Sequence, residues 1–138
     1  MPICTIQGPS GLSPQTKQKL INKTLSLLVD VYQMPDDRVF LNEYDLSNSG
    51  HTSHDGEDEL IIQTQKARPI CTFHTPPALP LEGKRKLVTE MTTHLADAYE
   101  ITDLRDILIF IQEYPLDVVA NNGYLQSENP EFASPATA

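Results

Sequence analysis

The sequence predicts an α+β domain made of two fused β-α-β units, which form a four-stranded mixed sheet with both helices on one face. Two observations carry this prediction. First, residues 2–5 (Pro-Ile-Cys-Thr) recur at residues 69–72, and sliding residues 2–38 over 69–105 without a gap gives 14 identities in 37 positions. Second, each copy shows a short strand pattern, a long helical pattern and another strand pattern. Internal repetition of this kind indicates a duplicated unit.

The first copy shows these elements in order. Residues 2–8 alternate in polarity as a strand does, and Gly8–Gly11 is rich in turn residues. Ser13 followed by Pro14 predicts a helix start, with apolar residues at helical spacing through 14–33. A proline at position 35 ends that helix. Residues 38–44 form the second strand, and residues 47–56 are expected to be a polar loop.

The second copy follows the same plan. A strand is predicted over 69–75, a helix over 81–100 and a strong strand over 107–112. Residues 59–66 either add a strand or extend the one at 69. The prediction is therefore one duplicated domain over residues 1–126, with repeat one at 2–56 and repeat two at 57–126, followed by a loose C-terminal tail at 127–138.

Composition narrows the function. The chain has 138 residues and a net charge of −9, with ten basic residues that are mostly scattered. Nucleic-acid binding requires clustered Lys and Arg, so nucleic acid is not expected as a partner. The sequence has no apolar run that could span a bilayer and no signal-peptide pattern, so no membrane association and a cytoplasmic location are expected.

The helix-free face of the predicted sheet would expose Ile, Phe and Leu side chains. A large exposed apolar surface usually marks an interface, so the sequence predicts an oligomer. Cys4 and Cys71 occupy equivalent repeat positions and are interpreted as free buried thiols. His51 and His54 lie among acidic residues, a pattern more typical of a solvated loop than of a metal site, and no metal ligand is assigned.

A proline directly after Met1, at the head of a duplicated β-α-β unit, resembles the tautomerase superfamily. The resemblance covers residues 2 to about 125. Besides Pro2, it rests on residues 12–14 (Leu-Ser-Pro), Arg38 at the start of the second strand, 41–44 (Leu-Asn-Glu-Tyr), and 110–115 followed by 121–124 (Asn-Asn-Gly-Tyr).

The resemblance implies a homotrimer, removal of Met1 and a cofactor-independent isomerase built around the freed Pro2 amine. A neutral amine can act as a general base beside a carbonyl, and a protonated one as a general acid. Arg38 matches a family arginine that binds the substrate carboxylate. The expected catalytic pair is thus Pro2 and Arg38, with Arg105, Tyr114 and Asn121 as substrate-binding candidates. A small carboxylate or carbonyl compound, an α-keto acid or an enol, would be the substrate.

The match to individual branches of the family is incomplete. Leu12 stands where the 4-oxalocrotonate tautomerase pattern has a second arginine. The paired loop arginines of the decarboxylase and dehalogenase branches fall near Pro77 and Leu79. The dehalogenase histidine, tyrosine and glutamate fall on Leu28, Phe110 and Asn121. Decarboxylation and dehalogenation are therefore less favoured than isomerisation.

Several alternatives remain open on the sequence. The chain can be a non-catalytic member of the same fold that serves as a binding or interaction protein. Arg38 and Arg105 can be surface ion-pair partners of Asp36 and Asp103 instead of ligands. Tyr114 and Asn121 can simply form a turn. If Pro2 is catalytic, we expect a concave pocket at its nitrogen with at least one arginine within reach.

Overall fold

The computed structural model describes residues 1–54, 57 and 59–131 of the chain. Its helices and strands, in chain order, are β1 (Ile3–Pro9), α1 (Pro14–Tyr32), β2 (Arg38–Tyr44), β3 (Gly50–His54), β4 (Leu60–Thr64), β5 (Ile70–Thr75), α2 (Leu81–Tyr99), β6 (Leu108–Glu113), β7 (Ala120–Asn121) and β8 (Tyr124–Leu125). Four single-turn 3-10 helices connect them: η1 (Leu46–Asn48), η2 (Leu104–Asp106), η3 (Leu116–Val118) and η4 (Gln126–Glu128).

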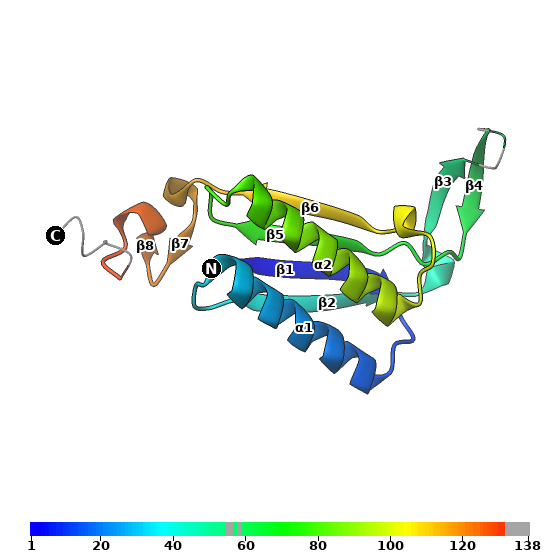
Figure 1. Ribbon diagram of the computed structural model, residues 1–138, viewed down its shortest axis with the longest axis horizontal. Coiled ribbons are helices and arrows are strands. Elements are labelled where there is room, and N and C mark those ends of the chain that lie inside the picture. Colours follow the sequence, from blue (N-terminus) through cyan, green and yellow to red (C-terminus); the bar gives the residue numbers. More distant parts are fainter. Residues whose placement is uncertain (55–56, 58, 132–138) are drawn as a thin grey trace.

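The main sheet has the strand order β2-β1-β5-β6, and both helices cover one of its faces (Figure 1). Strands β1 and β2 are parallel, as are β5 and β6, whereas the two central strands β1 and β5 run antiparallel. Thr5 lies opposite Thr72 at the centre of this antiparallel pair, so the two repeats are related by an approximate two-fold axis there. The predicted fold class is confirmed.

The core lies between the sheet and the two helices. Each helix places a buried face on the sheet, as the helical spacing predicts. The thiols of Cys4 and Cys71 are fully buried and unoxidised, with their sulfurs 3.4 Å apart across the central strand pair. The other buried apolar residues are Ile6, Leu20, Leu27, Leu28, Phe73, Leu87, Met91, Leu95 and Tyr99.

The helix boundaries agree closely with the sequence prediction. The Ser13 hydroxyl caps α1 by accepting a hydrogen bond from the Thr16 backbone N–H at 3.1 Å, and Pro14 occupies the first turn. Both helices end in a residue with left-handed backbone, Gln33 and Glu100, whose φ angles are 52° and 54°. No helix within the described ranges is long and apolar enough to cross a membrane.

A hairpin occupies much of the region predicted to be a polar loop. Strand β3 pairs antiparallel with β4, and residues 55, 56 and 58 of the expected loop lie outside the described residues. The hairpin projects from one end of the sheet, whereas β7 and β8 lie at the other end (Figure 1). The sequence prediction missed β3 because its residues, Gly-His-Thr-Ser-His, lack the apolar alternation that identifies a half-buried strand.

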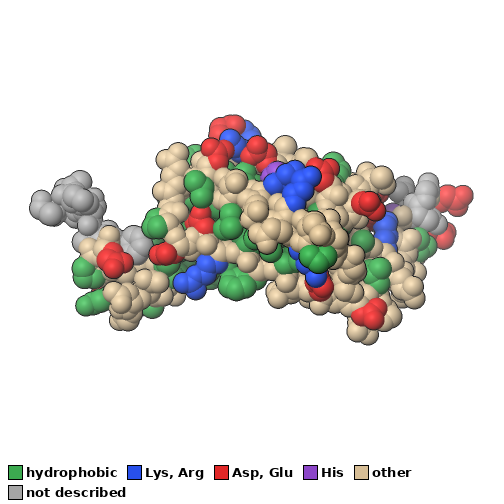
Figure 2. Space-filling model, turned by 90° about the horizontal axis from the view of Figure 1, so that it is seen from below, with side chains coloured by type: hydrophobic (Ala, Val, Ile, Leu, Met, Phe, Trp, Pro, Cys, Tyr) green, Lys and Arg blue, Asp and Glu red, His purple; other side chains and the backbone are tan. Residues whose placement is uncertain are grey.

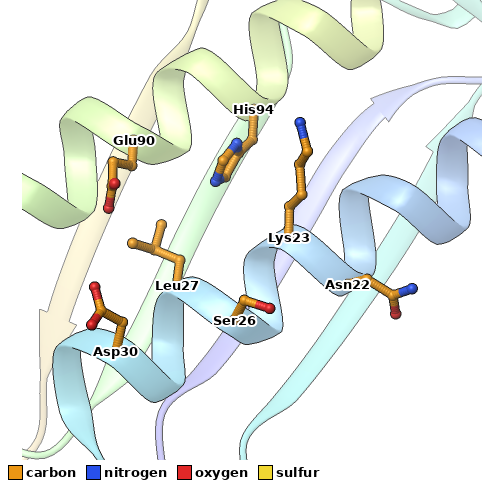
Figure 3. Close-up of a pocket in the computed structure, with 7 residues that line it drawn as sticks. All are labelled: Asn22, Lys23, Ser26, Leu27, Asp30, Glu90 and His94. Atoms are coloured by element: carbon orange, nitrogen blue, oxygen red, sulfur yellow. The ribbon is translucent and has the colours of Figure 1, made fainter.

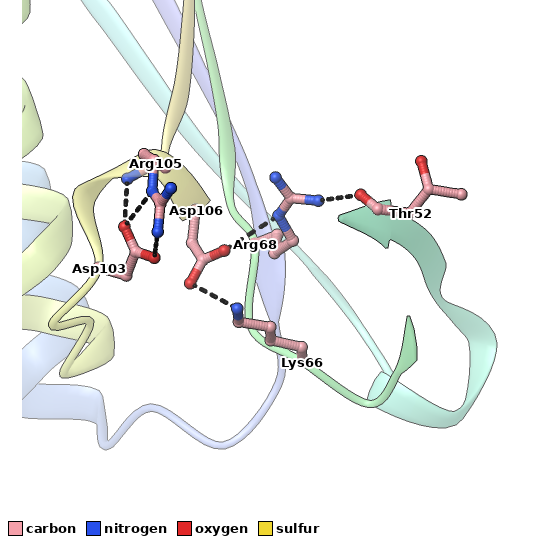
Figure 4. Close-up of polar contacts among 6 residues, drawn as sticks. All are labelled: Thr52, Lys66, Arg68, Asp103, Arg105 and Asp106. Atoms are coloured by element: carbon pink, nitrogen blue, oxygen red, sulfur yellow. Dashed lines mark hydrogen bonds and ion pairs between the residues drawn. The ribbon is translucent and has the colours of Figure 1, made fainter. Parts of the chain in front are cut away.

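Asp106 joins this hairpin to the sheet (Figure 4). Its carboxylate lies 3.1 Å from the Lys66 ammonium and 3.2 Å from the Arg68 Nε, while it remains only 8% exposed. Arg68 in turn donates a hydrogen bond through Nη1 to the Thr52 carbonyl oxygen of β3 at 3.1 Å. The base of the hairpin is therefore held by charge as well as by backbone pairing.

The predicted loose tail differs from the structure over its first residues. Ser127 and Glu128 belong to η4, and the Asn129 side chain is 1% exposed. The Asn129 side-chain amide donates to the backbone carbonyl oxygen of Asn121 at 3.4 Å and to the side-chain Oε1 of Gln126 at 3.3 Å. These hydrogen bonds hold the segment against β7. Residues 132–138 of the expected tail lie outside the described residues.

The helix-free face of the sheet exposes large apolar side chains, as expected. Phe40 and Phe110 are 50% and 47% exposed, and Ile70 and Leu108 are 38% and 49% exposed. Hydrophobic side chains also reach the surface at the end of the molecule that carries β7 and β8 (Figure 2). A soluble chain rarely leaves so much apolar surface in contact with water unless it has a partner.

Candidate active site at the N-terminal end of β1

The sheet register brings most of the predicted site residues to one end of the molecule. Ile3 lies opposite Arg38 of β2 on one side and opposite His74 of β5 on the other. Strand β6 ends at the same edge, where the Tyr114 N–H donates to the Thr75 carbonyl oxygen at 2.9 Å. Pro2 immediately precedes this register and is fully buried. Pro2, Arg38 and Tyr114 therefore share one edge of the sheet.

A pocket of about 740 Å³ opens at this edge. Most of its lining is apolar, and its polar groups come from a few residues only. It is lined by Met1, Ile3, Met34, His74, Thr75, Pro76, Pro77, Ala78, Tyr114, Leu116, Val118, Val119, Ala120 and Gln126. Ligand sites in proteins typically combine apolar walls with a small number of polar groups. A concave pocket lies at the N-terminus, but Pro2 is not among the residues that line it, so a pocket at the Pro2 nitrogen itself stays a prediction.

The terminal amine of the chain lies in this pocket. The Met1 ammonium is 3.6 Å from the Met34 sulfur, and the Met1 sulfur is 3.7 Å from the Gln126 side-chain amide nitrogen. Burial lowers the pKa of the Met1 amine below its ordinary value of 8.0, although the nearby Asp37 and Asp36 carboxylates act in the opposite direction. The pocket thus favours a neutral amine at its inner end.

Pro2 is fully buried between Met1 and Ile3, which both line the pocket, but Pro2 itself is not among the lining residues. With Met1 attached, the Pro2 nitrogen is an amide and has no basicity. The Pro2 carbonyl oxygen accepts a hydrogen bond from the Arg38 N–H at 3.3 Å, which anchors the start of β1 to β2. Pro2 is therefore held rigidly, and the chemical state of its nitrogen depends on Met1.

A histidine that the sequence prediction left out lies at the same end. His74 Nδ1 is 2.8 Å from the Tyr114 hydroxyl, and the two rings stack with centroids 5.7 Å apart. The Tyr114 hydroxyl donates to the Gln112 Oε1 at 2.9 Å. His74 looked like an ordinary strand residue because only the pairing of β5 with β6 places it beside Tyr114.

Arg38 lies at the correct edge but does not line the pocket. Its side chain is exposed, and it makes no ion pair with any residue in the described part of the chain. The expected surface pair with Asp36 is therefore not formed. No Lys or Arg side chain from the described residues lines the pocket, and Arg38 is joined to Pro2 only through the backbone hydrogen bond; an arginine side chain within reach of the Pro2 nitrogen stays a prediction.

Arg105 lies at the opposite end of the sheet and is not brought to Pro2 within the chain. It forms a two-pronged ion pair with Asp103, with contacts of 2.9 and 3.1 Å (Figure 4). The ungapped alignment made Arg105 equivalent to Arg38, but the structure corrects this equivalence. Arg38 faces Ile3 across β1 and β2, and the residue that faces Ile70 across β5 and β6 is Leu108.

Asn121 lies near the site and is mainly a turn residue. It closes the β7–β8 hairpin by pairing with Tyr124, and its carbonyl oxygen accepts from Asn129. The two residues between the strands, Asn122 and Gly123, have φ angles of 55° and 80°. Positive φ at both central positions is what a tight hairpin turn requires, so Asn-Gly suits this site. Its neighbour Ala120 lines the pocket, whereas Asn121 does not.

A second concavity of about 430 Å³ lies between the two helices (Figure 3). Asn22, Lys23, Ser26, Leu27 and Asp30 line it from α1, and Glu90 and His94 line it from α2. The pKa of His94 is lowered, chiefly by burial and also by the Lys23 charge. The groove carries Lys23 together with the carboxylates Asp30 and Glu90, and these side chains do not point to one common position where a ligand could bind (Figure 3). It is therefore a weaker candidate than the N-terminal pocket.

Comparison with known proteins identifies the fold. No protein-family model matches the sequence, and no curated protein matches it. Solved structures do match over nearly the whole chain. A fused 4-OT wild-type symmetric trimer has a TM-score of 0.75 at 12% identity, with 92% of this chain and 99% of that chain covered.

Two further structures give similar values. Pt0534 inactivated by 2-oxo-3-pentynoate has a TM-score of 0.73 at 15% identity, covering 89% of this chain and 94% of that one. FG41 malonate semialdehyde decarboxylase inhibited by 3-bromopropiolate has a TM-score of 0.69 at 20% identity, covering 96% and 99%. These neighbours are tautomerase-superfamily proteins. The chain has the tautomerase fold. At such identities the likeness establishes the fold alone, and the pocket described above must carry any functional argument.

Proposed function

We propose that the chain is a tautomerase-type isomerase that moves a proton on a small keto or enol substrate with the amine of Pro2. The observation that carries this proposal is the position of the chain terminus inside a largely apolar pocket, where burial already lowers the pKa of the Met1 amine. Removal of Met1 would convert the Pro2 nitrogen from an amide to a secondary amine at the inner end of the same pocket.

The proposed chemistry needs only proton transfer. A neutral Pro2 amine removes a proton from the carbon beside a carbonyl, and the electron pair of that C–H bond forms the C=C bond of the enolate. Return of the proton from the resulting ammonium to a carbon of the enol gives the keto form. No electrons are exchanged with an outside reagent, so we expect no cofactor and no metal.

Arg38 is the best candidate for binding a substrate carboxylate, if the substrate carries one. Its guanidinium is free of ion pairs among the described residues and lies at the same sheet edge as Pro2. Arg105 already forms an ion pair with Asp103, and it lies at the end of the main sheet opposite to Pro2. Tyr114 lines the pocket directly and can contact the substrate, whereas Asn121 supports the turn beside it.

A homotrimer is the assembly that we propose. The exposed Phe40, Ile70, Leu108 and Phe110 side chains lie on the face of the sheet that the helices leave uncovered. One of the structural neighbours is described as a symmetric trimer of fused 4-OT. Burying this face against two further copies would remove it from water. Sedimentation analysis would test this: a monomer at micromolar concentration would contradict the proposed trimer.

Intact-mass measurement of purified protein tests the first requirement, the loss of Met1. Enol ketonisation of phenylenolpyruvate and 2-hydroxymuconate is then compared between the wild type and Pro2→Ala. We add a matched control in which one alanine is inserted between Met1 and Pro2, so that the proline ring is kept but its nitrogen is acylated. We expect both variants to lose at least about 100-fold in kcat, the lower range for a proton-transfer group. Equal rates in all three proteins would rule out Pro2.

A catalytically inactive binding protein is the alternative. The lack of a Lys or Arg side chain in the described lining favours it. If purified protein keeps Met1 and shows no ketonisation above background, the binding alternative replaces the enzyme.

A further inference from the structure

The hydrogen bonds around Tyr114 define which nitrogen of His74 carries its proton. The Tyr114 hydroxyl donates its only proton to the Gln112 carboxamide oxygen, which accepts and cannot donate. The contact of 2.8 Å between the Tyr114 oxygen and His74 Nδ1 must then have Nδ1–H as the donor. Neutral His74 is therefore protonated at Nδ1, and its Nε2 carries a lone pair.

That lone pair is available at the pocket. His74 and Tyr114 both line it, and Nε2 makes no hydrogen bond to any residue in the part of the chain that the structure describes. Stacking of the two rings with an interplanar angle of 26° fixes the imidazole plane. The hydrogen bonds that join Gln112, Tyr114 and His74 thus hold His74 Nε2, a basic nitrogen, in an orientation set by β6.

The register places His74 at the start of β1, which Pro2 immediately precedes. His74 lies directly opposite Ile3, which follows Pro2, and neighbouring strands lie about 4.8 Å apart. A substrate at this edge has Pro2 at one strand and the imidazole at the next. Keto-enol exchange moves one proton at a carbon and another at an oxygen two bonds away, so two such groups on adjacent strands suit the reaction.

We propose that His74 is a second catalytic residue of this site and accepts the hydroxyl proton of an enol substrate through Nε2. This inference rests on the proposed function of Pro2. As the enol O–H bond breaks, its electron pair forms the carbonyl and the C=C electrons take a proton from the Pro2 ammonium. The products are the ketone, neutral Pro2 and the imidazolium of His74. Water then returns the proton from the imidazole to the amine, so atoms and charge balance over one turnover.

Tyr114 and Gln112 act as positioning residues in this scheme. They set the tautomer and the plane of the imidazole, as an orienting partner does for a catalytic histidine. The described lining has no Lys or Arg side chain to stabilise a full enolate charge, so transfer of the enol proton to His74 serves the purpose that an arginine would serve elsewhere. The proton acceptor would be local to one chain.

The first test is independent of activity. Long-range ¹H–¹⁵N NMR spectra of wild-type protein, with His74 assigned by its absence in His74→Asn, report which ring nitrogen is protonated when the imidazole is neutral. We expect Nδ1–H with unprotonated Nε2, and a mixture of tautomers in Tyr114→Phe, which lacks the acceptor oxygen. A neutral His74 protonated at Nε2 would overturn the inference.

The second test uses ketonisation of phenylenolpyruvate. His74→Asn is the informative variant, because its amide nitrogen can still donate to Tyr114 but has no counterpart of Nε2. We expect kcat of His74→Asn to fall about 100-fold with little change in KM. In His74→Ala, imidazole added to the buffer should restore part of the rate. A merely structural His74 predicts near-normal kcat for His74→Asn.

The two proposals fail in distinguishable ways. If wild-type turnover depends on Pro2 but survives in His74→Asn, the inference on His74 is wrong and the proposed function stands. If wild type loses Met1 and still shows no turnover, or if turnover is unaffected in Pro2→Ala, the proposed function is wrong and His74 loses its role with it. Loss of activity in both Pro2→Ala and His74→Asn, with native circular dichroism, supports both.

Discussion

Replacing Asp106 should loosen the attachment of the β3–β4 hairpin and destabilise the whole chain. Asp106→Ala removes one carboxylate that contacts both Lys66 and Arg68, at 3.1 and 3.2 Å. The carboxylate is 8% exposed, so the loss takes place in a partly dehydrated environment. The two cations are then left without their shared anion, and Arg68 retains only its hydrogen bond to Thr52.

The expected size of the effect follows from burial. Exposed ion pairs contribute about 0–1 kcal/mol, whereas breaking a fully buried pair costs about 3–5 kcal/mol. The side chains of Lys66 and Arg68 are 39% and 30% exposed, so the site lies between these limits. We expect a loss of about 2 kcal/mol in the free energy of unfolding. With an unfolding entropy of about 2.1 cal/mol/K per residue, this lowers the Tm by about 7 °C.

Thermal unfolding at one fixed protein concentration measures this loss, because oligomerisation makes the Tm depend on concentration. Arg105→Ala is the matched control: it removes the ion pair of the residue next to Asp106 in η2, but the Arg105 side chain is 88% exposed. The Tm of Arg105→Ala should not change measurably. If Asp106→Ala and Arg105→Ala unfold at the same temperature, the argument from burial is refuted.

Three further predictions concern stability and reactivity. Gly8→Ala should cost about 1–3 kcal/mol in urea unfolding, because its Cβ would lie 2.3 Å from the Tyr99 hydroxyl oxygen. Gly83→Ala on α2 should cost less, because its Cβ would lie 2.9 Å from the end of the Leu79 side chain, which can shift, and alanine favours the helix by up to about 1 kcal/mol. Burial lowers the pKa of His94, so the unfolded chain binds more protons near and below pH 6.5; stability should fall as the pH drops through this range, and His94→Gln should flatten that dependence in unfolding titrations. The pKa of the Cys71 thiol is raised well above its usual value by its buried thiol neighbour, so iodoacetamide should modify Cys71 only after unfolding, and rapid labelling of the native protein would contradict this.

The fold could be predicted because several independent patterns agreed. The repeated tetrapeptide located the two central strands, and their register now pairs Thr5 with Thr72. Ser13 and Pro14 predicted the start of the first helix, and in the structure Ser13 is the N-cap and Pro14 the first residue of α1. These are local features, and the duplication doubled the number of observations for each element. Local chemistry and global topology therefore pointed to the same arrangement.

The site could be predicted only in part, because it depends on long-range pairing. The connection between helix and strand is longer in the second repeat, so the ungapped alignment failed beyond α2 and made Arg105 equivalent to Arg38. The pairing of His74 with Tyr114 joins residues 40 positions apart, and no pattern in the sequence indicates it. Proline at position 2, by contrast, is informative in the sequence because only the chain terminus can carry a free amine.

The approximate symmetry of the sheet explains why we propose the chemistry at only one of its two ends. Pro69 repeats Pro2, and its carbonyl oxygen accepts from the Leu108 N–H at 3.3 Å just as Pro2 accepts from Arg38. Yet the Pro69 nitrogen is acylated by Arg68, whose guanidinium is bound by Asp106.

The groups opposite these two prolines differ as well. By position relative to the paired strands, His74 corresponds to Gln7 in the first repeat, and Tyr114 corresponds to Tyr44. The position equivalent to His74 is therefore held by an amide side chain, and the position equivalent to Pro2 by an acylated nitrogen. Duplication preserved the backbone at both ends, but it did not place a second imidazole and a second terminal amine at these equivalent positions.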